Sequence, residues 1–377
     1  MGLEDFSTDQ WFKNGVLQSD SLADHVLTEL DIVTLQDTDE MYVYEEGIYT
    51  DIGEERVAEF LTEELGDRYS RHIRREVTEV IRNKTRKPRS EFGRSTDWLC
   101  LKNCQYNVQT GKTKAHSPED EYLYRVDVAY HEEAGCPKFD RFLTEHVSPE
   151  QIHTVWCMFA HALHRGYPTQ SAFLLWGETA TGKSTTLRVL EKLIGMENVG
   201  AQSVRQLKQG NHAKANLYGK QANIVAEAPS PREMKQQEFK ALTGGDLIHA
   251  NPKHREPFEF YNTATMIFAT NDLFDMEELD DLESEYLRRW EMLPYKNSVP
   301  EDQRVDKFYQ TFTEDDDEMQ GILTRTLETL YRMTQRGGLS FEWDELYEYY
   351  TEIQERVKAD GNREEDEVEI DSGWFDI

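Results

Sequence analysis

The sequence has little of what a secreted or membrane-spanning protein requires. It contains four cysteines in 377 residues, too few for the disulfide framework of a small secreted domain. No apolar run approaches the ~18 residues that a membrane-spanning helix needs, and the N-terminus lacks the pattern of a secretory signal peptide. We therefore expect a soluble protein of the cytoplasm, or of the host cytoplasm if a virus encodes it, with no membrane partner.

Basic residues are also scarce. Lysine and arginine total 42 against 73 acidic residues, a formal net charge of -31. An acidic excess over most of a chain is typical of proteins adapted to a salt-rich cytoplasm, because a Debye length of about 3 Å near 1 M salt screens the self-repulsion. The alternative is an ordinary acidic protein with one acidic tail, since residues 301–377 alone carry a net charge of -15. The composition favours the halophilic interpretation.

The cysteines raise the question of a zinc site. Cys100 and Cys104 are followed by His116, His131 and Cys136. Their spacing fits no standard zinc pattern, and unpaired cysteines are often simply buried. We expect buried thiols here rather than a metal centre.

One segment carries the pattern of a phosphate-binding loop, G-x-x-x-x-G-K-[ST]. It comprises Gly177, Glu178, Thr179, Ala180, Thr181, Gly182, Lys183 and Ser184, and is followed by Thr185. An apolar stretch at 171–176 precedes the loop and predicts a buried strand. Apolar residues at helical spacing follow it as far as Gly195 and predict a helix.

Each residue type in this loop suits a triphosphate. Gly177 and Gly182 let the backbone wrap closely around phosphates, and the amides at the start of the helix point at them. Lys183 reaches the β- and γ-phosphates, and the Ser184 hydroxyl binds Mg²⁺. The sequence therefore predicts ATP and Mg²⁺ as cofactors, with the nine residues from Gly177 to Thr185 as the nucleotide-binding set.

Two later apolar runs end in polar residues. The run at 222–226 ends in Glu227, and the run at 265–270 ends in Asn271. A triphosphatase needs an acidic group near Mg²⁺ and the attacking water at the end of a second strand. We assign that role to Glu227, which makes it a metal ligand together with Ser184. Asn271 is expected to hold the lytic water or to sense the γ-phosphate.

Two further features lie around these runs. Alternating segments within residues 239–260 flank the stretch 251–255 and predict a β-hairpin with a basic tip at Lys253 and His254. Arg288 and Arg289 stand just before a strand-like segment, where a rigid guanidinium could act as an arginine finger on a neighbouring subunit's site. An ordinary surface hairpin is the alternative interpretation of the first feature.

The rest of the chain carries weaker signals. We predict a small hairpin at 41–49, an amphipathic helix at 54–65 and a helix from Pro149 to Arg165. Residues 68–94 hold ten basic and three acidic residues, which favours either a solvated helix face that balances acidic neighbours or a surface that faces nucleic acid. The C-terminal part is helical and acidic, and from about residue 362 it reads as a flexible tail.

The full series of motifs resembles the superfamily 3 helicases, in the phage and plasmid primase–helicase branch related to the poxvirus D5-type proteins. The phosphate loop, the acidic strand end, Thr243-Gly244-Gly245-Asp246, Ala269-Thr270-Asn271 and the Arg288-Arg289 pair occur in the family's order. The N-terminal part also resembles the accessory domain of that branch. The resembling segments are Thr78 to Thr85, Leu101 to Asn103, Thr110 to Lys112, His116 to Pro118 and Cys136 to Leu143.

The resemblance implies an α/β protein: a P-loop, AAA+-like helicase core at 146–300, an α+β D5-like N-terminal accessory domain at 1–145, and a helical C-terminal segment at 301–377. It implies a ring, expected to be a hexamer, that hydrolyses ATP and unwinds DNA during viral or plasmid replication. The acidic composition adds a haloarchaeal virus, plasmid or integrated element as the source.

The resemblance also implies roles for single residues and partners. Glu227 falls where the family binds Mg²⁺ and activates water, Asn271 on its sensor, and Lys253 and His254 on its DNA-tracking hairpin. Arg289 is expected to be the finger, with Arg288 as the alternative. The DNA partner is a single strand or a fork, and a separate primase or replisome protein is a further candidate partner, because primer synthesis is not expected of this chain.

One departure from the family stands out. Many members have paired acidic residues where this chain has Glu227-Ala228, so one carboxylate would serve both roles.

Three other functions compete: a P-loop ATPase that acts as a replication loader or packaging motor, a small-molecule kinase, and a scaffold that binds ATP only for assembly. The basic-tipped hairpin argues against the first, and intact Lys183, Ser184 and Glu227 argue against the last.

Overall fold

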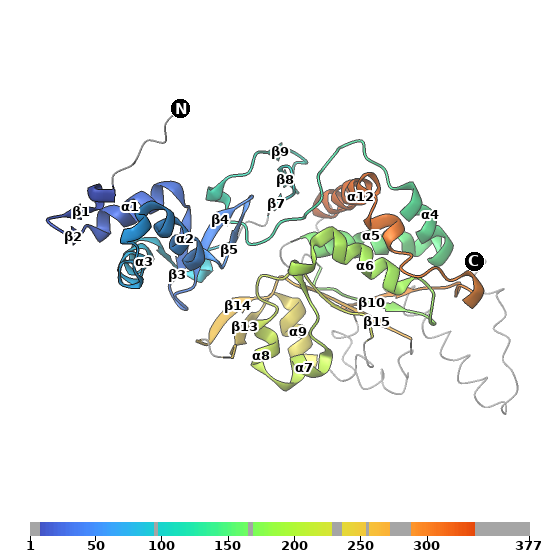
Figure 1. Ribbon diagram of the computed structural model, residues 1–377. Helices are drawn as coiled ribbons and strands as arrows, with labels where there is room; N and C mark the ends of the chain where they lie inside the picture. The colour runs from blue at the N-terminus through green and yellow to red at the C-terminus, as the bar shows by residue number, and fades with distance from the viewer. Residues whose placement is uncertain are drawn as a thin grey trace, which may run out of the picture.

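The computed structural model describes residues 8–93, 97–164, 169–227, 236–253, 256–271 and 288–335. An N-terminal region, in blue in Figure 1, lies beside a larger unit built on a parallel sheet. The elements of the N-terminal region are η1 (Thr8–Trp11), β1 (Phe12–Lys13), β2 (Val16–Leu17), α1 (Ser19–Glu29), β3 (Ile32–Leu35), β4 (Met41–Glu45), β5 (Ile48–Thr50), α2 (Gly53–Leu65), η2 (Gly66–Arg68), α3 (Arg71–Thr85), β6 (Arg86–Lys87) and η3 (Arg89–Glu91).

The N-terminal region forms its own small core. Its sheet has the strand order β5-β4-β3-β6, and α1, α2 and α3 pack against one another and against β3 and β4. Apolar residues at helical spacing on α2, Val57, Leu61 and Leu65, are buried together with Val77 and Ile81 of α3. The predicted hairpin at 41–49 is confirmed by β4 and β5, and the predicted helix at 54–65 by α2.

The larger unit begins with short strands and two helices. These are β7 (Trp98–Cys100), β8 (Gln105–Asn107), β9 (Thr113–Lys114), η4 (Pro118–Asp120), α4 (Pro137–His146) and α5 (Pro149–Leu163). Each of α4 and α5 starts with a proline, whose fixed φ suits the first helical position and whose missing N–H costs nothing there. Helix α5 confirms the predicted helix that starts at Pro149.

The centre of the larger unit is a five-stranded sheet of order β11-β12-β15-β10-β16, with every pairing parallel. Its elements and the hairpin beside it are β10 (Ala172–Trp176), α6 (Lys183–Ile194), η5 (Met196–Asn198), β11 (Val199–Gly200), α7 (Val204–Gln209), α8 (Asn211–Ala215), β12 (Ala222–Val225), α9 (Gln236–Gly244), β13 (Leu247–Ala250), β14 (Phe258–Tyr261), β15 (Thr265–Thr270) and β16 (Trp290–Pro294). The predicted strand, loop and helix around residues 171–194 are confirmed by β10 and α6.

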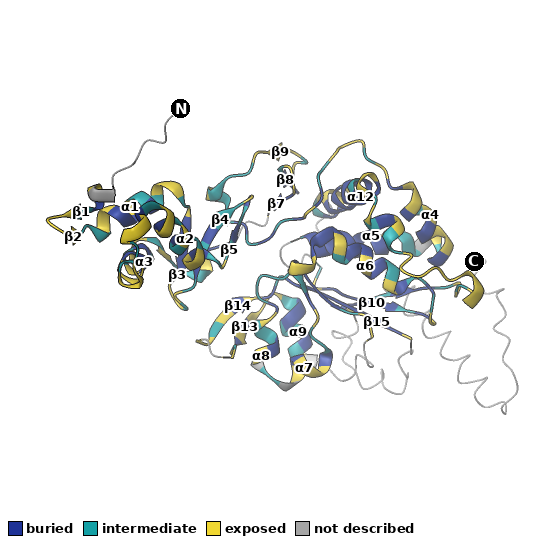
Figure 2. Cartoon of the chain, viewed as in Figure 1, coloured by how far each residue is buried: buried dark blue, intermediate teal, exposed yellow. Residues whose placement is uncertain are grey.

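Helices cover both faces of this sheet, which explains why its strands are mostly apolar. Successive side chains of a strand point to opposite faces. Accordingly Phe173 and Leu175 of β10 pack into the core beneath α5 and α6, while Ala172 and Leu174 pack into the core that contains α9. Figure 2 shows the strands and the inner faces of these helices as buried.

The C-terminal elements join the first of these cores. They are η8 (Glu301–Gln303), α11 (Gln310–Thr313) and α12 (Asp316–Gln335). Helix α12 lies along α5 (Figure 1), and Phe312 packs edge-on against Phe139 with ring centroids 5.5 Å apart. One hydrophobic core thus runs from Leu99 through the sheet to Met333, across the positions 145 and 300 at which we predicted boundaries. Those boundaries stay predictions.

The predicted hairpin within residues 239–260 exists as β13 and β14, which pair antiparallel from Leu247↔Tyr261 to Ala250↔Phe258. The segment before it is not part of the alternation: Phe239 to Gly244 lie in α9. Phe239 and Leu242, three residues apart, share one buried helix face. Thr243 and Gly244 of the expected Thr-Gly-Gly-Asp hairpin motif therefore lie at the end of a helix, before the hairpin begins.

The basic segment at 68–94 divides into two parts. Its C-terminal half is neutralised by acidic partners from elsewhere in the region: Arg82 by Glu54, Lys84 by Asp20 and Asp24, Arg86 by Asp39, Lys87 by Glu121, and Arg89 by Asp37 and Glu40. Arg71, Arg74 and Arg75 at the start of α3 are exposed. The balancing of acidic neighbours thus accounts for half of the segment.

The cysteines behave as expected for buried thiols. All four are unpaired, and Cys100, Cys136 and Cys157 are buried, which raises the pKa of each of these three thiols to about 12. Over the described ranges, no group of three or more His, Cys, Asp or Glu side chains could hold a metal ion. No helix among these residues is long and apolar enough to cross a membrane. The predicted tail from residue 362 lies outside the described residues.

Leu330→Ala should destabilise the larger unit strongly. Leu330 of α12 is fully buried in the core that contains α5 and α6, so its truncation leaves a cavity and should lower the free energy of unfolding by about 3 kcal/mol. The neighbouring Tyr331 is 37% exposed, and Tyr331→Ala should change it by less than about 1 kcal/mol. Urea titration followed by circular dichroism measures both. Equal losses for the two variants would contradict the packing of α12.

Candidate functional site

The register of the parallel sheet brings three predicted features to one edge. Trp176 at the end of β10 pairs with Thr270 at the end of β15, and Val225 at the end of β12 pairs with Phe268. Two residues beyond Val225, Glu227 is therefore level with Thr270 and next to Asn271. The glycine-rich loop leaves β10 at this same edge, the carboxyl edge at which open α/β sheets bind ligands.

The loop is shaped by glycines in positions that other residues would not tolerate. Gly177 has φ 152°, and a Cβ on it would lie 2.3 Å from the Tyr295 carbonyl oxygen. Gly182 has φ 96° and caps the start of α6, where a Cβ would lie 2.8 Å from the Phe142 ring. Both contacts are too close for a side chain, so the pattern of glycines is required by the packing as well as by any ligand.

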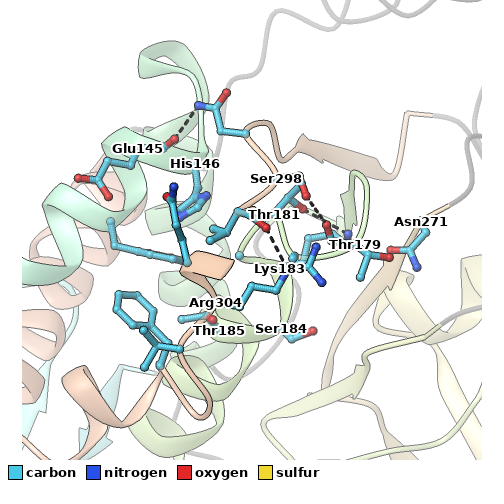
Figure 3. A pocket seen from close by; sticks show the side chains of 18 of the residues that line it. Glu145, His146, Thr179, Thr181, Lys183, Ser184, Thr185, Asn271, Ser298 and Arg304 are labelled. Carbon is cyan, nitrogen blue, oxygen red and sulfur yellow. Dashed lines mark hydrogen bonds between the residues drawn. The ribbon is translucent and has the colours of Figure 1, made fainter. Parts of the chain in front are cut away.

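A segment after β16 holds the loop from outside. The Ser298 hydroxyl donates to the Thr179 carbonyl at 2.8 Å, and the Val299 amide donates to the Ala180 carbonyl at 3.0 Å. The Asn297 side-chain amide donates to the Glu145 carbonyl of α4 at 2.7 Å. These bonds join the loop, α4 and the chain beyond β16 into one wall (Figure 3).

Lys183 is folded back onto its own loop. Its ammonium donates to the carbonyls of Gly177 and Glu178, the latter at 2.7 Å, and lies 3.4 Å from the Thr181 hydroxyl. Burial lowers the pKa of this lysine to about 8. The charge of Glu178 opposes this effect only in part, so an anion near the buried ammonium would stabilise it further.

The loop opens onto a cavity of about 820 Å³. Its lining comprises Phe142, Glu145, His146, Thr179, Ala180, Thr181, Gly182, Lys183, Ser184, Thr185, Ala226, Glu227, Thr270, Asn271, Asn297, Ser298, Val299, Pro300, Gln303, Arg304, Val305 and Phe308. The predicted residues Lys183, Ser184, Glu227 and Asn271 thus face a common space. Figure 3 shows Thr181 and Lys183 between Asn271 on one side and His146 on the other.

One end of the cavity was not predicted from the sequence. Phe142 and His146 of α4 lie with ring centroids 4.7 Å apart, and burial lowers the pKa of His146, which favours the neutral ring. Phe308 stands 6.1 Å from Phe142 between ring centroids, and Val305 beside it is 65% exposed. This end is apolar and aromatic, whereas the loop end is polar, so the cavity suits a ligand with a flat ring and a charged chain.

The two arginines lie at the other edge of the sheet. The Arg289 carbonyl accepts the Ala172 amide at the start of β10, one five-residue strand, or about 16 Å, from the carboxyl edge. Arg289 is buried and donates to the Thr243 hydroxyl at 2.8 Å and to the Lys240 carbonyl at 3.1 Å. Arg288 is exposed. Neither side chain reaches the loop of its own chain, and the Arg289 side chain is hydrogen-bonded to α9.

The hairpin lies apart from the cavity. Lys253 is exposed at the described end of β13–β14. His254 and Ala228 lie outside the described residues.

Comparisons with known proteins agree with this architecture. Residues 7–148 match a family described as "D5 N terminal like", and residues 175–289 match a "Family of unknown function (DUF5906)". No curated protein matches the chain. Solved structures of the apo C-terminal region of NrS-1 share the fold at 12% sequence identity: one covers 83% of this chain and 71% of the other with a TM-score of 0.52, and a second covers 85% and 69% with a TM-score of 0.53.

The two kinds of match concern the same arrangement of parts. The D5-like match covers the α+β N-terminal region together with β7 to α4, and the shared fold extends over more than four fifths of the chain. The family model covers residues 7–148, less than half of the chain, and the solved structures at 12% identity show a shared fold.

Proposed function

We propose that this protein is an ATP-dependent DNA helicase that works as a ring, expected to be a hexamer, in viral or plasmid replication. The observation that supports this best is the single cavity onto which Lys183, Ser184, Glu227 and Asn271 open. A buried cation, a hydroxyl at a helix start, a carboxylate and an amide at neighbouring strand ends are the groups that triphosphate hydrolysis uses. The related family provides the DNA-directed part of the proposal.

The residues present fit ATP with Mg²⁺. The loop amides and the start of α6 would bind phosphate oxygens, and Lys183 would exchange its loop carbonyls for them. Ser184 and Glu227 would hold Mg²⁺, which when bound neutralises phosphate charge. Glu227 would accept a proton from the attacking water, and Asn271 would orient that water. The apolar end between Phe142 and Phe308 would take the base.

A replication loader or a packaging motor would use the same cavity, so the hairpin decides between these functions. β13–β14 projects as a separate two-stranded sheet (Figure 1) with Lys253 exposed near its end. An exposed basic residue on a hairpin suits contact with the backbone of a DNA strand. Neither a kinase nor an assembly scaffold needs that element.

We propose Arg288, in place of Arg289, as the arginine that completes a neighbouring subunit's site. Arg289 is held by Thr243 and Lys240 inside its own chain, and a finger has to be free to approach another subunit. Arg288 is exposed at the same edge. Its position one strand length from its own loop fits a role in trans.

Glu227→Gln should stop ATP turnover while it preserves ATP binding. The amide keeps the shape of the side chain but cannot accept a proton, so kcat should fall at least about 100-fold. Lys183→Ala should abolish hydrolysis and weaken binding. Glu197→Gln is the matched control, because Glu197 is an exposed carboxylate that does not line the cavity. Steady-state hydrolysis and strand displacement at high KCl measure the effects, and normal turnover in Glu227→Gln would require another acid.

Lys183 should make nucleotide binding pH-dependent. Its pKa is about 8 in the free protein, and a bound triphosphate should raise it. Binding at pH 8.5 should therefore take up roughly 0.7 of a proton, and affinity should fall above pH 8 by up to about tenfold per unit. Calorimetry of ATP in buffers of different ionisation enthalpy, in the Glu227→Gln background, measures the uptake. Lys183→Arg should show none, because a guanidinium stays charged over this range.

Arg288→Ala should reduce hydrolysis about 1000-fold without loss of stability. Rings mixed from Arg288→Ala and Lys183→Ala subunits should recover part of the activity, because some interfaces then pair an intact loop with an intact arginine. Arg289→Ala should instead lower the free energy of unfolding, since it removes the bonds to Thr243 and Lys240. Recovery with Arg289→Ala subunits, and none with Arg288→Ala subunits, would reverse the assignment.

A further inference from the structure

Arg89 of η3 lies where the N-terminal region meets the larger unit. On its own side it is bound to the turn between β3 and β4. Its Nε donates to one carboxylate oxygen of Asp37 at 2.8 Å, and its Nη2 donates to the other at 3.2 Å and to the Thr38 hydroxyl at 3.0 Å. This two-pronged pairing fixes the plane of the guanidinium as well as its position.

On the other side the guanidinium meets two aromatic rings of the larger unit. Its Cζ lies 4.6 Å from the ring centroid of Tyr218, which precedes β12, and 4.4 Å from that of Phe258, the first residue of β14. Tyr218 and Phe258 are packed edge-on at 5.3 Å, and Tyr218 also packs on Phe260 at 5.6 Å. Arg89 thus covers an aromatic cluster at the base of the hairpin.

The surroundings make this contact strong. The Arg89 side chain is only 7% exposed, against 37% for Arg86 in the same segment. Burial by itself would lower the pKa of Arg89, but the hydrogen bond and charge of Asp37, together with the side chain of Tyr218, raise the pKa above its ordinary value. A desolvated cation over an aromatic face is worth more than an exposed one. A lysine would keep the positive charge. It could neither donate two parallel hydrogen bonds to a carboxylate nor stack flat on an aromatic ring.

The hairpin needs such a support. β13 and β14 pair only with each other in the described part of the chain, and an isolated two-stranded sheet is marginally stable. On the inner side, α8 packs against β13, with His212 bonded to the Asn251 carbonyl. On the side of the N-terminal region, Arg89 reaches β14 directly. Ile248, Ala250 and Phe260 of the hairpin are also buried in the core that contains α9. The direction in which the hairpin projects is therefore set by this core, by α8 and by Arg89.

We propose that Arg89 is a positioning residue that joins the hairpin to the N-terminal region, so that the two move as one body. The N-terminal region then sets the angle at which Lys253 is presented. The positional part stands on the contacts of Arg89 alone; the consequence for DNA rests on the proposed helicase function. The two parts have separate measurements.

Hydrogen exchange measures the positional part on the full chain. Arg89→Ala should speed exchange of the β13–β14 amides at least roughly fivefold and leave β10 and α6 unchanged. Arg89→Lys should give most of the same increase. Arg86→Ala is the matched control, since Arg86 pairs with Asp39 in the same region and touches neither ring. Phe258→Leu should cause the same increase in hairpin exchange. The double variant Arg89→Ala with Phe258→Leu should exchange no faster than Arg89→Ala alone. Unchanged hairpin exchange in Arg89→Ala, or an equal increase in Arg86→Ala, would overturn the proposal.

DNA-stimulated ATP hydrolysis measures the consequence. Arg89→Ala should keep the basal kcat and KM for ATP, because the cavity is untouched, and should lose at least about tenfold of the stimulation by single-stranded DNA. A lost basal rate would mean that Arg89 supports the fold in general and would overturn the positioning role. Faster hairpin exchange with full stimulation would refute the coupling. If the unaltered protein shows no stimulation, the helicase function fails, and the exchange data still decide the role of Arg89.

Discussion

The parallel pairing of β10 with both β15 and β16 is the constraint on which the candidate site depends. It sets Trp176, Thr270 and Pro294 side by side at one edge. From this edge the chain leaves as a glycine loop after β10, as Asn271 after β15, and as the Tyr295–Val299 segment after β16. Gly177 presses against the backbone of Tyr295, so the loop cannot shift without moving β16. The ammonium of Lys183 is held within the first of these segments, by the carbonyls of Gly177 and Glu178.

The sequence was sufficient wherever a role depends on local pattern and sheet geometry. An apolar run followed by a polar residue predicted where Glu227 and Asn271 emerge, because parallel strands all end at one edge. It was insufficient for the aromatic end of the cavity. Phe142 and Phe308 lie 166 positions apart in the chain and meet only through the packing of α4 against the C-terminal elements. The hydrophobic periodicity of neither segment predicts this contact between the two rings.

At two places the fold adds information that the local sequence pattern does not carry. The preference for Arg289 rested on its position directly before an apolar strand, but strand pairing begins there: the Ala172 amide bonds its carbonyl and its side chain turns inward to α9. The residue one step earlier is the exposed one. The charge of the segment 68–94 left two interpretations open, and the acidic partners of its C-terminal half, which come from Asp20 to Glu121, favour the balancing of acidic neighbours there.

The same acidic surroundings explain why the joint between the two regions uses a buried arginine. Near 1 M salt, a Debye length of about 3 Å leaves exposed ion pairs with little mutual attraction. Most pairs of the N-terminal region, that of Arg89 with Asp37 included, have at least one partner that is a third or more exposed. The Arg89 side chain itself is 7% exposed and also contacts two aromatic rings. Its contact with β14 combines packing with electrostatics, and packing is not screened. A joint of this kind holds the hairpin at high salt, where a surface ion pair in its place would not.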